Sequence, residues 1–407
     1  MNQVKLGIIR EGKVPPDKRV PLTPKQCKLV ELKFPQVKVV VQASEVRAFD
    51  DEEYEAEGIE VVKDLSDCDV IMGVKEVNIP DLIPGKKYLF FSHTIKKQPY
   101  NRDLLRAILE RKIQLIDYEV LKSKENKRII GFGRYAGIVG AYNGLLAYGE
   151  RNNLYKLKPA NQCSGRKEME AELHKVVLPV NTKLVLTGFG RVGYGAREIM
   201  DLLPFTEVSP EEFLTENFDT PVFTHLEIED YYKRKDGKPF SKQEFYSTPE
   251  LYESSFGRYS EVADIYIACH FWSNKSPFIL TAADLKSEKN KIRVVADVSC
   301  DIQGPIASSI RASKISDPLY GYDPQTGLEC DWKQEGAITV MAVDNLPCEL
   351  PKDASEDFGN ELIKSVFPHL FGDDPDNIIG RGSETDLNGN LTPYFSYLND
   401  YVNQLTT

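Results

Sequence analysis

Two apolar runs of strand length each end at an ionisable side chain. The run in DVIMGVKEV, residues 69–77, ends at Lys75, and the run in YLFFSHTIKKQ, residues 88–98, ends at His93. Burial lowers the pKa of a lysine, and an imidazole titrates near neutral pH, so the two groups would make an acid/base pair. Taken singly, Lys75 could equally cap a strand at the surface, and His93 could be a hydrogen-bonded histidine between sheet and loop.

Further charged residues stand at or near comparable strand ends. Asp117 and Glu119 close the run QLIDYE, and Lys96 follows His93. In open α/β sheets ligands bind outside the carboxyl ends of the strands, so these side chains are expected to converge with Lys75 and His93. A lysine such as Lys96 would attract an acidic substrate there, or would simply face water.

Arg19 lies in VPPDKRVPLTP, a proline-stiffened loop after the first apolar run. A guanidinium can hold a carboxylate in a two-pronged contact, which a lysine cannot. The alternative is a solvated loop arginine. The whole cluster of charges, more than any one member, favours a site for an acidic substrate.

A glycine-rich turn gives the clearest signal for a nucleotide. In LVLTGFGRVGYGARE, a β-rich run leads into G-x-G-x-x-G and then into a helical stretch. In this setting the glycines let backbone amides at a helix start approach a pyrophosphate, whereas a packing role alone is the other interpretation. The candidate cofactor contacts in this motif are Gly188, Gly190, Arg191, Val192 and Gly193.

The acidic residue that would bind a ribose hydroxyl about 20 positions further on is not evident. The next predicted strand, FTEV, ends at Ser209, and Glu211 and Glu212 follow it. Ser209 is therefore our candidate at this position. The sequence leaves the choice between NAD and NADP open.

Apolar runs alternate with amphipathic stretches, which is typical of βα units around a parallel sheet. We expect a first series of strands at 4–10, 37–42, 69–74, 87–93 and 113–119, and a second at 182–188, 263–269, 292–299 and 337–344. Helices are expected at 22–33, 136–150 and 195–203, and in a tail from about residue 352. Residues 210–258, rich in Glu, Tyr and Lys, are interpreted as an insertion.

Composition limits the class of protein. A chain of 407 residues predicts two domains, and its net charge of −11 disfavours nucleic acid and anionic membranes as partners. No apolar run reaches the roughly 18 residues that span a bilayer, and MNQVKLGIIREG is typical of a strand and loop, so we expect a cytosolic protein. The seven cysteines are scattered without a C-x-x-C pair, so neither disulfides nor a metal site are expected.

These motifs resemble a known family. GIIREGKVPPDKRVPLTP and GVKE are similar to the alanine dehydrogenase, transhydrogenase and saccharopine dehydrogenase superfamily. Within it, FFSHTIKKQ, QLIDYE, GFGRYAG, TGFGRVGYGA, VVADVSCDIQGPI and VDNLPCELPKDASEDFGNEL most resemble the lysine–ketoglutarate reductase half of a bifunctional enzyme, and next the fungal lysine-forming saccharopine dehydrogenase. The resemblance covers nearly the whole chain.

The resemblance implies two Rossmann-like α/β domains with parallel sheets and a cleft between them. The substrate domain would be discontinuous, residues 1–138 plus 352–407, and residues 139–351 would form the dinucleotide-binding Rossmann domain. The implied reaction is the NAD- or NADP-dependent reductive condensation of L-lysine with 2-oxoglutarate to saccharopine, or its reverse.

Roles follow from matching motif to motif. Lys75 and His93 correspond to the family's acid/base pair, and Arg19, Lys96 and Glu119 match substrate-binding positions. Two further substrate candidates are Asp117, for a substrate ammonium, and Arg134, where the family is not basic and a charge could select the keto acid. Asp344 and Leu346, in VDNLP, match a loop that lies against the nicotinamide and substrate.

Other functions remain open. An alanine-dehydrogenase-like or opine-type amino-acid dehydrogenase belongs to the same class, although FSHTIKKQ and VDNLPCELP favour the saccharopine branch. A nucleotide-binding sensor without catalysis would have no need of a titrating pair such as Lys75 and His93. The direction of the reaction, the exact amine and keto acid, and the assembly state, a homo-oligomer included, are also left open.

Overall fold

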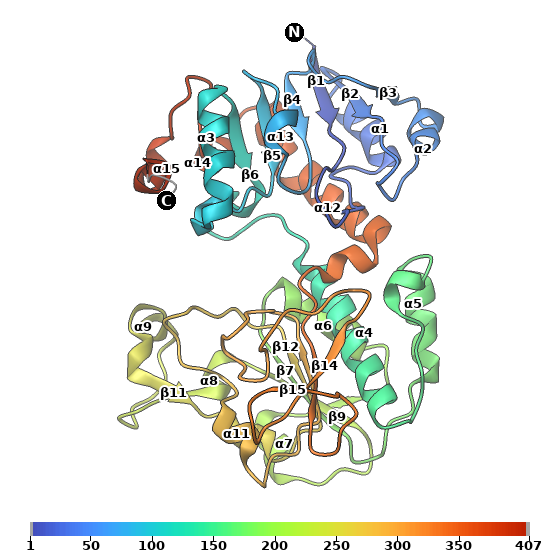
Figure 1. Ribbon diagram of the computed structural model, residues 1–407, viewed down its shortest axis with the longest axis vertical. Coiled ribbons are helices and arrows are strands. Elements are labelled where there is room, and N and C mark those ends of the chain that lie inside the picture. The colour runs from blue at the N-terminus through green and yellow to red at the C-terminus, as the bar shows by residue number, and fades with distance from the viewer. Residues whose placement is uncertain (1–2, 404–407) are drawn as a thin grey trace. The chain divides into compact units, whose positions relative to one another are not determined.

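The computed structural model describes residues 3–403, and the chain divides into two compact units (Figure 1). Unit 1 comprises the chain up to Phe132 together with the chain from Pro351 onward. Unit 2 is Gly133–Leu350. The chain thus leaves unit 1, forms unit 2, and returns to complete unit 1.

Unit 1 is built on a six-stranded sheet in which every pairing is parallel. The order is β3-β2-β1-β4-β5-β6, with β1 Val4–Ile8, β2 Val37–Gln42, β3 Glu60–Val62, β4 Val70–Met72, β5 Lys87–Phe90 and β6 Gln114–Asp117. The strands are rich in valine, isoleucine and leucine because both faces of a covered parallel sheet are buried. Because all strands are parallel, their carboxyl ends lie along one edge.

Helices cover the two faces of this sheet with separate apolar clusters. One cluster joins the sheet to Cys27 and Val30 of α1 and to Phe358 and Leu362 of α12, and the other contains Leu104 of α3. The helices of unit 1 are α1 Pro24–Lys33, α2 Asp51–Ala56, α3 Arg102–Glu110, α12 Pro351–Ser365, α13 Phe367–Phe371, α14 Ile378–Gly382 and α15 Asn399–Asn403. Short 3-10 turns are η1 Ile79–Asp81, η2 Thr94–Lys96, η3 Pro99–Asn101, η4 Tyr118–Val120 and η9 Pro393–Leu398.

Unit 2 is built on an eight-stranded sheet of order β15-β14-β16-β13-β12-β7-β9-β8. The strands are β7 Lys183–Thr187, β8 Thr206–Glu207, β9 Val222–Leu226, β12 Ile265–Ala268, β13 Val294–Asp297, β14 Leu319–Tyr322, β15 Glu329–Cys330 and β16 Ile338–Met341. From β16 to β8 the pairings are parallel, and β14 and β15 add an antiparallel edge. The predicted α/β class with two largely parallel sheets is confirmed.

The other elements of unit 2 flank this sheet (Figure 1). The helices are α4 Gly133–Arg151, α5 Arg166–Glu172, α6 Arg191–Met200, α7 Pro210–Thr215, α8 Ile228–Tyr231, α9 Lys242–Ser247, α10 Gly257–Ser260 and α11 Ala282–Lys286, with 3-10 turns η5 Ala160–Gln162, η6 Leu173–Lys175, η7 Pro249–Leu251 and η8 Leu346–Glu349. A separate antiparallel ribbon pairs β10 Tyr232–Arg234 with β11 Tyr252–Ser254.

Glycines let helices α4 and α6 pack backbone to backbone. A Cβ atom on Gly137 would lie 1.8 Å from the Val192 carbonyl oxygen, and one on Gly195 would lie 2.0 Å from the Arg134 carbonyl oxygen. No larger residue fits at either position without moving a helix. The predicted long helix therefore exists, and its glycines serve this close approach.

The interpretation of residues 210–258 as an insertion is wrong in one respect. Within it, β9 (Val222–Leu226) is buried along its whole length and lies between β7 and β8 in the main sheet. The predicted strand FTEV is only the two-residue, exposed edge strand β8. The sequence of β9, VFTHL, includes Thr224 and His225 and stands inside a polar stretch, so no apolar periodicity distinguishes this central strand from a buried turn.

Candidate functional site

The carboxyl edge of the unit 1 sheet carries the predicted acid/base residues. Lys75 follows β4, His93 follows β5, and Asp117 is the last residue of β6. Strands β4, β5 and β6 are consecutive neighbours in parallel register, so their ends meet at one edge as expected. The left-handed backbone conformation of His93 (φ 56°, ψ 11°) turns the chain sharply after β5.

His93 has a partner that the sequence did not reveal. Its Nδ1 lies 2.6 Å from Oε1 of Glu76, and Nζ of Lys13 lies 3.1 Å from Oε2 of the same carboxylate. Burial alone would raise the pKa of Glu76, but the hydrogen bond from His93 and the charge of Lys13 bring it down to about 2. An ionised carboxylate only accepts hydrogen bonds, so Nδ1 carries a proton and Nε2 is left for acid/base work.

Lys75 is half-buried beside other positive charges. Burial lowers the pKa of its ammonium from the ordinary 10.5, and the charges of Arg19 and Lys13 lower it further. Among residues 3–403 its Nζ has neither a hydrogen-bond nor an ion-pair partner. A cation of this kind releases its proton more readily than a surface lysine and is suited to donate and accept protons in turn.

Glu11 fixes the backbone on which Lys75 stands. Its two carboxylate oxygens accept from the amides of Val74 and Lys75, at 2.6 and 3.0 Å. Burial raises the pKa of Glu11 to about 7, although these amides and the charge of Arg19 work against that rise. The end of β4 is therefore anchored by a carboxyl group from the loop after β1.

Arg19 is buried, with 3% of its surface exposed, and is not the solvated loop arginine of the alternative interpretation. Its guanidinium makes a two-pronged contact with Asp17, with Nε–Oδ1 at 3.0 Å and Nη2–Oδ2 at 2.6 Å. It also stacks over the ring of Phe132, 4.1 Å from the centroid. Arg19 is thus a fixed cation close enough to influence Lys75, and its contact with substrate stays a prediction.

The remaining substrate candidates have different surroundings. Lys96 and Glu119 face each other, with Nζ and Oε1 3.6 Å apart, and the other oxygen of Glu119 is buried without a partner in the described part of the chain. Asp117 is fully buried and bonded to Ser92, so the expected contact with a substrate ammonium is not supported. Arg134 lies in unit 2, where Nε is 2.6 Å and Nη2 is 2.9 Å from the carboxylate oxygens of Glu198.

In unit 2 the glycine motif forms a tight turn between β7 and α6. Gly188 has a positive φ of 97°, and a Cβ there would lie 2.5 Å from the Cys269 carbonyl oxygen. A Cβ on Gly193 would lie 1.7 Å from the Gly188 carbonyl oxygen, which also accepts from Nε2 of His225 at 2.8 Å. A Cβ on Gly190 would meet nothing within 4 Å. Two glycines are therefore required by packing, and Gly190 leaves open space at the start of α6, as a pyrophosphate would need.

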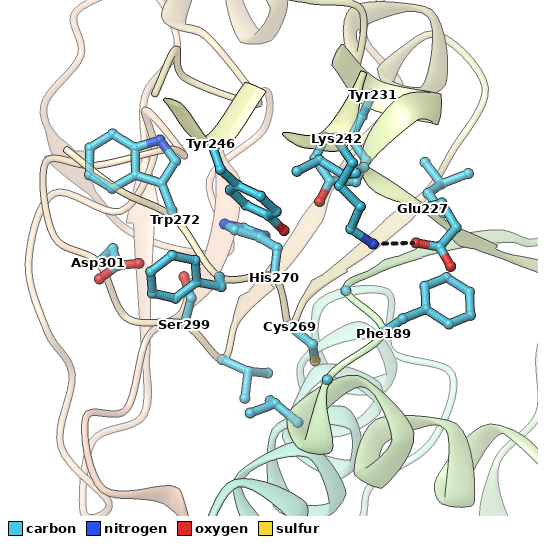
Figure 2. A pocket seen from close by; sticks show the side chains of 17 residues that line it. Phe189, Glu227, Tyr231, Lys242, Tyr246, Cys269, His270, Trp272, Ser299 and Asp301 are labelled. Carbon is cyan, nitrogen blue, oxygen red and sulfur yellow. Dashed lines mark ion pairs between the residues drawn. The ribbon is translucent and has the colours of Figure 1, made fainter. Parts of the chain in front are cut away.

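A cavity of about 550 Å³ lies over this turn (Figure 2). It is lined by Gly188, Phe189, Gly190, Val192, Leu226, Glu227, Ile228, Tyr231, Lys242, Tyr246, Cys269, His270, Phe271, Trp272, Val298, Ser299 and Asp301. Gly188, Gly190 and Val192 were predicted; the other walls come from the ends of β9, β12 and β13 and from α9. The carboxyl ends of parallel strands thus surround the turn, as in nucleotide-binding sheets.

Glu227 stands where the acid that the sequence could not place would be expected. It directly follows β9, the strand beside β7, and lines the cavity, with Nζ of Lys242 3.9 Å away (Figure 2). Ser209 instead caps the exposed helix α7, where its hydroxyl accepts from the Glu212 amide, and it does not line the cavity. The candidate at this position therefore changes from Ser209 to Glu227.

His270 offers a polar atom to this cavity. Its ring is buried, Nδ1 lies 3.1 Å from Oγ1 of Thr187, and Nε2 has no partner among the described residues. Burial lowers the pKa of His270 to about 3, so the ring is neutral. An unpartnered buried nitrogen in a cavity wall is a group that a ligand can satisfy.

Asp344 and Leu346 follow β16 but do not line this cavity. Asp344 is exposed, whereas Leu346 is buried and would lie 3.2 Å from a Cβ atom on Gly140 of α4. Their expected role toward a nicotinamide stays a prediction.

Comparison with known proteins agrees with these features. Residues 7–139 match the family model described as alanine dehydrogenase/PNT, N-terminal domain. This stretch contains the end of β1, all of β2 through β6, and both Lys75 and His93. Residues 7–139 are an alanine dehydrogenase/PNT N-terminal domain.

Full-length relatives extend the match. Alpha-aminoadipic semialdehyde synthase of Arabidopsis thaliana is 30% identical over 398 residues, covering 88% of this chain and 37% of that protein. The mitochondrial alpha-aminoadipic semialdehyde synthase of Rattus norvegicus is 30% identical, covering 94% of this chain and 46% of the relative. The chain spans less than half the length of these relatives. The lysine-forming, NAD(+) saccharopine dehydrogenase of Schizosaccharomyces pombe is 26% identical, covering 88% of this chain and 91% of the relative. The predicted family resemblance is confirmed.

Solved structures share the fold. An L-alanine dehydrogenase superposes with a TM-score of 0.62 at 15% identity, covering 97% of this chain and 99% of that one. A transhydrogenase from Sinorhizobium meliloti gives a TM-score of 0.58 at 14% identity. At these identities the likeness concerns the fold alone.

Proposed function

We propose that this chain is an NAD(P)-dependent oxidoreductase that condenses L-lysine with 2-oxoglutarate reductively to saccharopine, or catalyses the reverse, lysine-forming reaction. The observation that carries the proposal is a pair at neighbouring strand ends of an alanine dehydrogenase/PNT N-terminal domain. Lys75 is half-buried and has no counter-ion among residues 3–403, and His93 is oriented by Glu76. The homologous alpha-aminoadipic semialdehyde synthases and saccharopine dehydrogenases favour these substrates over others.

The chemistry needs two proton-transferring groups. Forming an imine between an amine and a keto acid removes a proton from the amine and adds protons to the departing water, which one group alone does poorly. Lys75, with its lowered pKa, and His93, through Nε2, could exchange these roles. When bound, the reduced nicotinamide supplies the hydride that converts the imine to a secondary amine.

Positive charge is also required, because saccharopine and 2-oxoglutarate carry several carboxylates. In unit 1 the candidates are Arg19, Lys13 and Lys96. Fixed cations bind a carboxylate at a smaller entropic cost than mobile ones, so the buried Arg19 is the best placed of the three to orient substrate.

We assign coenzyme binding to unit 2. The cavity above the glycine turn fits a dinucleotide because Gly190 leaves space at the start of α6 and His270 presents an unpartnered nitrogen. Glu227 would accept hydrogen bonds from ribose hydroxyls and would repel a 2′-phosphate, whereas Lys242 would attract one. NAD and NADP are therefore both candidates, and the balance between these two side chains sets the preference.

This balance can be measured. Glu227→Gln should raise the ratio of kcat/KM for NADPH to that for NADH by about tenfold, because one repelling charge worth on the order of 1.4 kcal/mol is removed. Lys242→Gln should lower the same ratio. Glu211→Gln, on helix α7, lines neither this cavity nor the pocket beside it and is the matched control. An unchanged ratio in both variants would remove this pair from coenzyme selection.

The substrate assignment is tested by coenzyme oxidation with purified protein. Oxidation of NADH or NADPH should require both L-lysine and 2-oxoglutarate and should stop when either is omitted. Oxidation with pyruvate and ammonia would instead support an alanine-dehydrogenase-type reaction. Coenzyme binding without turnover on any amine and keto acid would support a nucleotide sensor.

Location and assembly belong to the proposal as well. Within residues 3–403 no helix combines the length and the apolar character needed to cross a membrane. The cytosolic location expected from the sequence stays a prediction, since the name of the Rattus norvegicus relative places that protein in mitochondria. A measurement of the protein's mass in solution would show whether it forms a homo-oligomer.

A further inference from the structure

The C-terminal tail extends the unit 1 sheet beyond β6. Ile116 forms an antiparallel bridge with Ser383, and the amide of Glu384 donates to the Leu115 carbonyl at 2.8 Å. The Leu115 amide donates in turn to Oγ1 of Thr385 at 2.9 Å. Residues 383–385 are thereby fixed along β6, close to the strand end that carries Asp117.

This arrangement buries two carboxyl groups together. Asp117 and Glu384 are both 0% exposed, and both are bonded to the hydroxyl of Ser92, which lies 3.4 Å from Oε1 of Glu384. Oγ1 of Thr94 donates to Oε2 of Glu384 at 2.5 Å, and the amide of Glu119 donates to Oδ1 of Asp117 at 2.6 Å. Within residues 3–403, neither carboxyl group forms an ion pair with a lysine or arginine.

His93 lies in the chain between Ser92 and Thr94, the two hydroxyl residues that are hydrogen-bonded to this carboxyl pair. Its left-handed backbone conformation costs roughly 1 kcal/mol for a residue with a side chain, so the surrounding bonds must fix it. The Ser92 amide donates to Oδ2 of Asp117 at 3.0 Å, and the Thr94 amide donates to Oγ of Ser92 at 3.2 Å. The residues before and after His93 are therefore both tied to the buried carboxyl groups.

We propose that Glu384 and Asp117 share one proton and that, through Ser92 and Thr94, they are positioning residues that hold His93 at the edge of the sheet. The inference rests on the proposed function, in which His93 transfers protons. It assigns a part in the reaction to the C-terminal tail, whose Glu384 contacts Ser92 and Thr94, the residues on either side of His93.

Electrostatics supports a single shared proton. Two carboxylates in one buried place repel each other strongly, and no lysine or arginine in the described part of the chain forms an ion pair with either. Burial, together with the nearby charge of Asp117, raises the pKa of Glu384 well above its ordinary 4.5. Glu119 also faces Asp117, and its negative charge disfavours a second charge on the pair. The phenols of Tyr118, Tyr397 and Tyr401 face the pair as well and are neutral, because burial and these carboxyl groups raise their pKa values. Glu384 therefore carries the proton and donates it toward Asp117.

Variants at both members test the arrangement through kcat. Glu384→Gln keeps a neutral donor in the same shape, whereas Glu384→Ala and Asp117→Asn remove the donor or the acceptor. The latter two should each lower kcat at least tenfold with coenzyme affinity unchanged, and Glu384→Gln should restore most of the kcat lost in Glu384→Ala. Equal kcat losses in Glu384→Gln and Glu384→Ala, or no loss in either Glu384→Ala or Asp117→Asn, would overturn the proposal.

A second measurement needs no substrate and so separates this inference from the proposed reaction. A carboxyl group whose pKa is raised on folding contributes stability that is lost as pH rises above its unfolded value of about 4.5. Glutamine at 384 does not titrate. The thermal midpoint of the wild type should therefore fall relative to that of Glu384→Gln as pH rises from 5 to 9, by roughly 2–4 °C for each pH unit over which the proton is lost. Parallel midpoints across this range would contradict a shared proton even if the reaction is as proposed, and a fall without any turnover would sink the reaction alone.

Discussion

At the residue scale, the account depends on a lysine and a histidine whose surroundings differ. Burial and the charges of Arg19 and Lys13 lower the pKa of the Lys75 ammonium. His93, in contrast, is hydrogen-bonded to Glu76, whose carboxylate is ionised at neutral pH. A half-buried lysine with a lowered pKa, on the strand next to a histidine that a carboxylate orients, is typical of acid/base sites.

Removing either group should depress turnover without affecting the coenzyme. Lys75→Met and His93→Gln should each lower kcat by about 10²–10⁴, the usual contribution of a general acid or base. Coenzyme affinity, measured by quenching of protein fluorescence, should change less than about twofold, because both residues lie in unit 1 and the glycine turn lies in unit 2. Lys87→Met, at the opposite end of β5, is the control and should keep the wild-type kcat. Wild-type turnover in either of the first two variants would remove that residue from the chemistry.

Glu76 should act on kcat through His93. Glu76→Gln removes the negative charge that faces Nδ1 but keeps an acceptor of the same shape, so we expect kcat to fall by about 10–100-fold, less than in His93→Gln.

The pH dependence of stability gives an independent check. Because the pKa of Glu76 is lowered on folding to about 2, its contribution to stability is present above pH 4.5 and is lost as the pH falls toward 2. The stability of Glu76→Gln should therefore fall less steeply with decreasing pH than that of the wild type. Identical acid transitions would refute the stabilisation of the Glu76 carboxylate by His93 and Lys13.

The sequence contained part of this site. Lys75, His93, Glu119 and Lys96 could be predicted because each lies at or just beyond a strand end that local apolar pattern reveals. Glu384 could not, because it reaches the site by a contact with Thr94 that spans 290 residues of the chain, and no local sequence pattern indicates such a contact. Asp117 was recognised as a strand-end carboxylate, yet only packing decides whether such a group faces solvent or the interior.

At the scale of elements, the glycines divide into those that packing requires and one that the ligand would require. Gly137 lies against the α6 backbone, whereas a Cβ on Gly190 meets open space. The first kind can be explained from the protein alone. The second indicates room reserved for another molecule.

This difference gives a paired prediction. Gly137→Ala should destabilise the protein by about 1–3 kcal/mol, in spite of the gain of roughly 1 kcal/mol in helix propensity, because α4 and α6 must separate. Gly190→Ala should leave the thermal midpoint within about 1 °C of the wild type yet weaken coenzyme binding at least tenfold, because the added methyl group fills space beside the turn. Thermal unfolding and coenzyme titration distinguish the two. Unchanged coenzyme affinity in Gly190→Ala would contradict the placement of the pyrophosphate.

Element prediction failed where the sequence pattern was weakest. The alternation of apolar runs and amphipathic stretches predicts both sheets. It does not predict β9, which lies in a polar stretch, and for that reason the sequence indicated Ser209 and not Glu227 as the candidate for the ribose. A strand is stabilised by its neighbours in the sheet, and that information is not local.

At the scale of the whole molecule, the chain builds two parallel sheets and uses its C-terminal segment to complete the first. Helix α12 packs against α1, and residues 383–385 add to β6. The tail therefore belongs to unit 1, the unit to which we assign the substrate.

The central claim is that this scaffold reduces an imine formed from an amine and a keto acid. Its most direct test uses reduced coenzyme carrying deuterium at the transferable position, together with L-lysine and 2-oxoglutarate, and mass analysis of the product. The account predicts saccharopine with one deuterium on the carbon that was the keto carbon, formed about 10²–10⁴-fold more slowly by Lys75→Met. Coenzyme left unoxidised with this pair of substrates, or deuterium found in alanine when pyruvate and ammonia are supplied instead, would contradict it.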